Sequence, residues 1–133
     1  MSPGSTTDTT FWAVLAFLLA HELDAVERHE WRLFPVLRSL PDEVAGRAFV
    51  LLHVPLFVAL FRLVRHPSTT VRRRSQFVVS VFAVVHAGLH ARFSDHPAYE
   101  FDGALSKLLI DGAAVAGLIH LGQVVGTDGA DER

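Results

Sequence analysis

Four apolar stretches of this 133-residue sequence each carry an ionisable residue at a similar distance from one end of the stretch. These residues are His21, His53, His86 and Asp111. If the stretches form antiparallel helices that rise ~1.5 Å per residue, the four side chains lie at a depth of ~9–12 Å from one shared face. Ionisable groups inside apolar helices are costly, so a layer of them is a candidate functional site. We therefore expect all four side chains to point into the interior and to lie close together.

A further histidine, His90, follows His86 by four residues. Residues four apart share a helix face, so both imidazoles can bind one metal ion, although the segment lacks the glutamate of the HExxH motif. The sequence contains no cysteine, which leaves only histidine and carboxylate ligands. Such ligands suit zinc or non-haem iron, and the chemistry would be metal-assisted hydrolysis or oxidation of a lipid-like substrate. The candidate ligands are His21, His53, His86, His90 and Asp111.

The segment HELDAVERHEWR, residues 21–32, is dense in polar groups. Asp24 lies three residues after His21 on the same helix face, so it can share an ion with His21 or orient its ring, and Glu22 is a second supporting carboxylate. We interpret the remaining charges as a solvated turn at the membrane edge with local ion pairs; these are Glu27, Arg28, Glu30 and Arg32. His120 belongs to a different layer near the opposite face. Gly88 is expected to let another helix approach closely.

Two other functions fit the same polar layer. Haem b could be bound by paired histidines, with His21 or His53 opposite His86, although carboxylates in the same layer disfavour it. The protein could also be an ion relay or a non-catalytic membrane subunit whose polar contacts lock the helix register. In that case Asp111 pairs with Lys107, one turn earlier on the same helix.

The elements that position these residues are predicted from the distribution of apolar side chains. Residues 48–61 have no polar face at any angle, and residues 77–91 have only Ser80 and two histidines. Helices that are apolar all round need lipid or a large protein around them, and 133 residues cannot supply the latter. The sequence predicts an all-α, antiparallel up-down-up-down four-helix transmembrane bundle. The expected spans are about 10–28, 44–64, 75–93 and 104–125, between polar tails at residues 1–9 and 126–133.

Charge patterning bears on partners and orientation. The formal net charge is −2, which gives no support for nucleic-acid binding, so membrane lipid is the expected partner. Residues 62–74 contain five arginines and no acid, which places this connection and both termini in the cytoplasm, with the protein in the cell (plasma) membrane. The opposite side carries four arginines interleaved with acids, so the asymmetry is small.

The segments that carry chemistry also carry a resemblance. HELDAVERHEWRLFP (21–35), HVPLF (53–57), HAGLH (86–90) and HPAYEFD (96–102) together resemble an uncharacterised prokaryotic family of small four-helix integral membrane proteins with a HELDA…HEWR signature. The resemblance covers nearly the whole chain between the polar tails and implies a transmembrane bundle with no established activity. A fainter likeness to membrane metallohydrolases of the ceramidase and progestin-receptor type, which have seven spans rather than four, carries over no activity.

Overall fold

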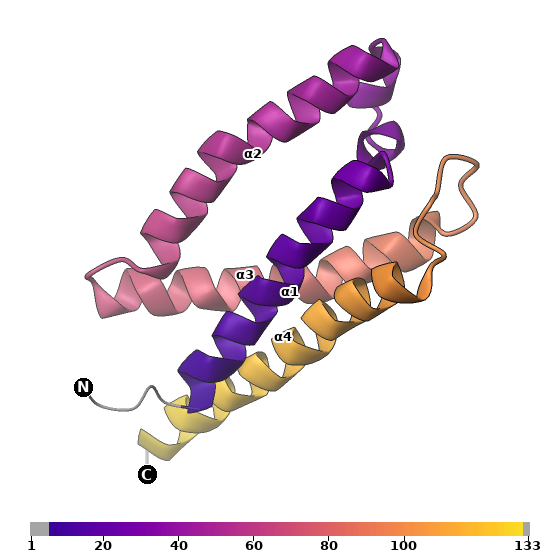
Figure 1. Cartoon of the computed structure of the whole chain (residues 1–133). Coiled ribbons are helices and arrows are strands. Elements are labelled where there is room, and N and C mark those ends of the chain that lie inside the picture. Colours follow the sequence, from indigo (N-terminus) through magenta and orange to yellow (C-terminus); the bar gives the residue numbers. More distant parts are fainter. Residues whose placement is uncertain (1–5, 132–133) are drawn as a thin grey trace.

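The computed structural model describes residues 6–131, with side chains described as far as Gly126. Four helices follow one another in alternating directions (Figure 1): α1 (Thr6–Glu27), α2 (Asp42–Val64), α3 (Thr69–Phe93) and α4 (Ala104–Asp131). Two short 3₁₀ turns, η1 (Glu30–Leu33) and η2 (Leu37–Ser39), connect α1 to α2. The part of the chain that the structure describes contains no strand. The predicted all-α four-helix bundle is confirmed.

The helix ends have local causes. Pro41 precedes α2, and Asp42 and Glu43 occupy its first turn, where acidic side chains stabilise the positive end of the helix dipole. The end of α1 is followed by His29 in the left-handed conformation, with φ 52° and ψ 44°. This conformation reverses the chain direction after the helix, and the turn η1 begins at the next residue. The α1–α2 connection therefore folds back over the end of the bundle.

Close packing is concentrated where α4 runs along α1 and α3 (Figure 1). At Gly112, an added Cβ would lie 2.7 Å from Cε1 of Phe17 on α1. At Gly117, it would lie 2.9 Å from the backbone oxygen of Ser80 on α3. By contrast Gly88, where close helix approach was predicted, is exposed with open space beside it, so that prediction is wrong. The small residues that bring helices together are those of α4.

The outer surface of the bundle is largely apolar, and α2 shows this most clearly. Leu51 and Val54 expose 67% and 61% of their surface. All four helices are long and apolar enough to cross a membrane. Apolar faces of this extent on a small chain need lipid around them, which indicates a multi-pass membrane protein.

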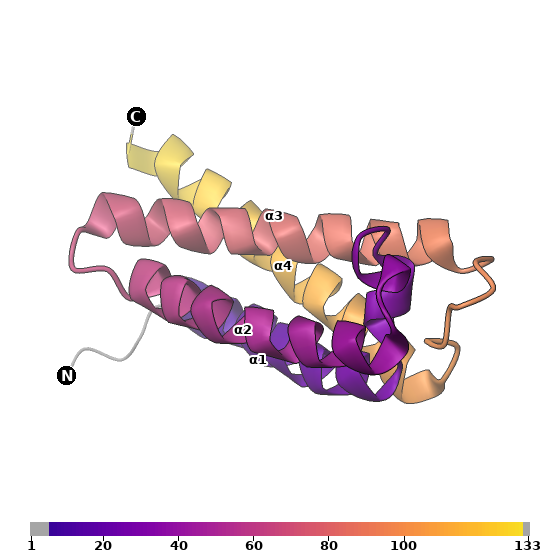
Figure 2. The ribbon, with the colours of Figure 1, turned by 90° about the horizontal axis from the view of Figure 1, so that it is seen from above.

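Two connections lie together at one end of the bundle, while the start of α1, the end of α4 and the α2–α3 connection lie at the other (Figure 2). The first contains η1 and η2, and the second comprises residues 94–103 between α3 and α4. Trp31 of η1 and Phe101 of the second connection are both buried in one hydrophobic cluster with Phe49 of α2. This cluster fixes η1 against the helix ends, and the polar residues described next lie beside it.

Candidate metal centre

Four potential metal ligands converge beside this end of the bundle. His21 comes from α1, His86 and His90 from α3, and Glu30 from η1. One ligand atom from each residue lies within 4.8 Å of all the others. His21 is fully buried, and Glu30 and His90 are each only 6% exposed. We call these four residues the His₃Glu cluster.

The distances within the His₃Glu cluster are too long for hydrogen bonds and suit an ion. The Glu30 carboxylate oxygens lie 3.5 Å from Nε2 of His21, 3.6 Å from Nε2 of His86 and 3.7 Å from Nε2 of His90. Nitrogen–oxygen hydrogen bonds usually measure ~2.7–3.2 Å. Ligand atoms bound at ~2.1 Å to a tetrahedral ion lie roughly 3.4 Å apart. Both ring nitrogens of His21 lack a hydrogen-bond partner among the described residues, which is unusual for buried polar atoms.

The three imidazole rings also pack directly against one another. The ring centroid of His21 lies 4.8 Å from that of His86 and 5.0 Å from that of His90. Both pairs of rings are in edge-on contact. His90 lies against the ring of Phe101, and its Nδ1 is 3.3 Å from the Tyr99 hydroxyl, so its Nε2 is left to face Glu30. Rings in such contact leave no room for a porphyrin between His21 and His86. The haem alternative therefore gains no support from this geometry.

Glu30 is the member of the cluster that sequence reasoning missed. The prediction that Glu30 belongs to a solvated turn is wrong, because the side chain is buried against the three histidines. Burial raises the pKa of its carboxyl, whereas the neighbouring His21 and His86 outweigh burial and lower the pKa to about 2. Helical periodicity could not reveal it, since α1 ends before Glu30 and the left-handed His29 redirects the chain.

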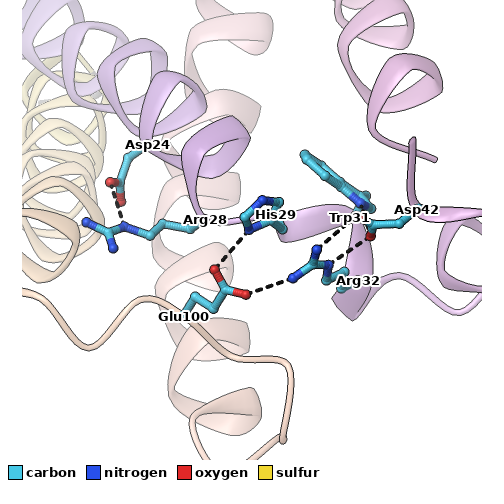
Figure 3. Close-up of polar contacts among 7 residues, drawn as sticks. All are labelled: Asp24, Arg28, His29, Trp31, Arg32, Asp42 and Glu100. Atoms are coloured by element: carbon cyan, nitrogen blue, oxygen red, sulfur yellow. Dashed lines mark hydrogen bonds and ion pairs between the residues drawn. The ribbon is translucent and has the colours of Figure 1, made fainter. Parts of the chain in front are cut away.

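A polar network holds η1 in place (Figure 3). His29 Nδ1 donates to Glu100 at 3.0 Å, and Arg32 donates to the other oxygen of Glu100, also at 3.0 Å. Arg32 further binds both carboxylate oxygens of Asp42 at 2.8 Å, and Trp31 Nε1 donates to Asp42 at 3.0 Å. Hydrogen bonding by His29, with Arg32 close by, lowers the pKa of Glu100 despite the opposing effect of burial. Glu30 thus lies between residues anchored to the second connection and to α2.

His53 and Glu22 form a separate pair. His53 Nε2 lies 2.8 Å from a carboxylate oxygen of Glu22, and its Nδ1 lies 2.7 Å from the backbone oxygen of Phe49. Both ring nitrogens of His53 therefore face oxygen atoms. In this arrangement His53 has no free nitrogen for a metal, and neither residue belongs to the His₃Glu cluster.

The remaining predicted residues lie elsewhere. Asp111 is exposed on α4, so the prediction that it points into the interior is wrong; α4 turns Ile110 and Ala113 inward instead. Asp24 is buried and pairs with Arg28 at 3.4 Å (Figure 3). His120 is buried in a different layer, as expected.

In that layer, His120 contacts the hydroxyl of Ser80 and the ring of Phe11. His120 Nδ1 lies 2.8 Å from the hydroxyl of Ser80, between α4 and α3. No member of the His₃Glu cluster takes part in this contact.

A cavity of about 470 Å³ adjoins the cluster between α2 and α3. Its polar wall consists of Glu30, His86 and His90 together with the His53–Glu22 pair. The other ten of its fifteen lining residues are apolar and come from α2, α3 and the α1–α2 connection. The His₃Glu cluster is therefore reached through an apolar space.

The fold and the cluster define a class: an all-α protein with four membrane-length helices and a His/Glu group that could hold a metal ion. Comparison with protein families identifies the family to which the chain belongs. Residues 7–127 match the family described as "Family of unknown function (DUF6713)", and the chain belongs to that family. No curated protein and no solved structure matches the chain.

Proposed function

We propose that this protein binds one transition metal ion, zinc or non-haem iron, inside the membrane through His21, Glu30, His86 and His90. The observation that carries the proposal is the spacing of one buried carboxylate from three imidazole nitrogens, at 3.5, 3.6 and 3.7 Å. These donors come from α1, η1 and α3, and they are too far apart to satisfy one another. An ion at their centre would satisfy all four.

The identity of the ion determines the role of the site. Zinc bound by four protein ligands has a complete tetrahedron, which is typical of structural sites, whereas iron commonly accepts further ligands and would leave positions open for chemistry. Bound at this site, the metal would supply Lewis acidity for hydrolysis or redox chemistry for oxidation. Iron content would therefore favour an enzyme, and zinc content a site that holds α1, η1 and α3 together.

The substrate class we propose is lipid-like, and the cellular partner is membrane lipid. The support is the mainly apolar cavity beside the cluster and the apolar outer surface of α2 and α3. We further propose that the protein lies in the cell membrane with both termini in the cytoplasm, because the arginines of residues 62–74 favour that side for the α2–α3 connection.

Elemental analysis of protein purified without chelators tests the metal site. We expect about one equivalent of zinc or iron per chain, and less than about one tenth of an equivalent in His21→Ala and in His86→Ala. Asp111→Asn, on the exposed face of α4, and His53→Ala, outside the cluster, should keep the parent metal content. Metal-free parent protein, or equal loss in all four variants, would contradict the proposal.

A further inference from the structure

We infer that the cavity between α2 and α3 binds a single-chain neutral amphiphile, with its acyl chain in the apolar part and its ester, amide or hydroxyl end at the polar wall. The inference rests on the proposed function only in that the polar end would lie beside the metal. The chain-binding part stands on the cavity itself, which adjoins the His₃Glu cluster and has a volume of about 470 Å³.

The size of the cavity favours one chain. Pockets for small molecules usually measure ~300–1,000 Å³, and this one lies in the lower half of that range. A membrane lipid with two chains and a large head group would exceed it. The apolar lining includes Phe49 and Leu56 of α2 and Phe82 and Phe93 of α3, which can surround a chain from two sides.

The cavity is continuous with the surface that faces lipid. Leu52 and Leu56 line it, yet they are 59% and 54% exposed on α2. Phe82 and Leu89 line it from α3, and they are 48% and 46% exposed. The same side chains thus form both the cavity wall and the outer face of the bundle. A chain can enter sideways from the bilayer without crossing a polar surface.

The polar wall indicates which end group the cavity accepts. Five of the fifteen lining residues are histidine or glutamate, and no described lining residue is lysine or arginine. A phosphate or sulfate group would therefore lack a cationic partner and would face the carboxylate of Glu30. The Glu22 carboxyl has a second oxygen beyond the one that faces His53, and it can exchange a hydrogen bond with a neutral hydroxyl, amide or carbonyl group. The chemistry of the wall matches an ester, an amide or an alcohol.

Tryptophan quenching provides the test. Trp31 lies 5.9 Å from the ring of the cavity residue Phe49, and Trp12 on α1 is replaced by phenylalanine so that only Trp31 reports. The probe is the methyl ester of a brominated long-chain fatty acid, added to the full-length protein in mild detergent. We expect saturable quenching. Leu52→Phe and Leu56→Phe fill the cavity, and overpacking of this kind should weaken binding by about tenfold or more.

The control is Leu51→Phe, which adds the same bulk to the adjacent exposed position outside the cavity and should leave binding unchanged. Quenching that never saturates, or that is equal in all variants, overturns the inference. A brominated alkyl phosphate of equal chain length should bind at least about tenfold more weakly, and equal or tighter binding overturns the assigned end group.

Metal content is measured in the same preparations. Saturable ester binding in protein without metal would support this inference and refute the proposed function. Bound metal without saturable ester binding would support the proposed function and refute this inference.

Discussion

The Glu30 carboxylate lies 3.5 Å from Nε2 of His21, although α1 ends between the two residues. This proximity depends on the left-handed His29 and on η1, which turns the chain back onto the bundle. Glu30 is the one cluster member that η1 contributes. The contacts that hold η1 in place therefore also position the Glu30 carboxylate. The consequences can be tested one contact at a time.

Glu100 should tune metal binding without touching the metal. Glu100→Gln weakens the contacts with His29 and Arg32 that anchor η1. Changes to such outer partners typically reduce metal affinity about 10–100-fold, and we expect a loss in this range by chelator competition. The matched control is Glu43→Gln, which removes an exposed ion pair with Arg47 on α2. Equal affinity in the two variants would mean that the network does not position Glu30.

The same network predicts a pH effect on stability. The folded-state pKa of Glu100 is lowered from its ordinary value of 4.5, so its anion stabilises the folded state above pH 4.5. That contribution should be lost as the pH falls through the lowered folded-state pKa. The difference in thermal stability between the parent and Glu100→Gln should therefore be full at neutral pH and should vanish in acid. A difference that grows on acidification would contradict this assignment.

The contact between α3 and α4 should tolerate no methyl group at Gly117. Gly117→Ala places a Cβ 2.9 Å from the Ser80 backbone oxygen, which is too close for carbon and oxygen, so the helices must shift apart. Overpacking of this kind usually costs ~1–3 kcal/mol. Gly122→Ala is the control, because no described atom other than its chain neighbours and the nearby backbone of its own helix lies within 4 Å of the added Cβ. Thermal unfolding in detergent should show a lower midpoint temperature for Gly117→Ala than for the parent. The midpoint of Gly122→Ala should not be lower than that of the parent.

The contact between Ser80 and His120 should affect stability and leave metal content unchanged. Ser80→Ala removes the partner of a buried imidazole nitrogen, which should cost ~1–3 kcal/mol. Ser75→Ala, which removes only a bond to the backbone oxygen of Val71 in the same helix, should cost less. Loss of metal in Ser80→Ala would show that the two polar layers are coupled.

The sequence predicts much of the fold, because apolar residues around the whole circumference of residues 48–61 and 77–91 require membrane helices. It also brings out His21, His86 and His90, since helical spacing and similar depth depend only on the local sequence. Asp111 was wrongly placed because the rotation of α4 follows from packing at Gly112 and Gly117, which the sequence alone does not specify.

Two further parts of the site depend on contacts between segments far apart in the sequence. His53 binds Glu22 of α1 across the α1–α2 pair, in addition to the backbone oxygen of Phe49 in its own helix, so its depth in α2 does not determine its partner on α1. Glu30 required knowledge of a turn set by one residue with positive φ and by anchors in residues 94–103. Neither relationship is visible in helical periodicity.

The most direct measurement compares the metal content of Glu30→Gln with that of Glu27→Gln. The two glutamates are only three residues apart in the sequence, but Glu30 is buried in the His₃Glu cluster and Glu27 is exposed at the end of α1. We predict that Glu27→Gln keeps about one equivalent of zinc or iron, while Glu30→Gln falls below about one tenth of an equivalent. Equal metal content in the two purified variants would contradict the assignment of Glu30 as a ligand and, with it, the metal centre.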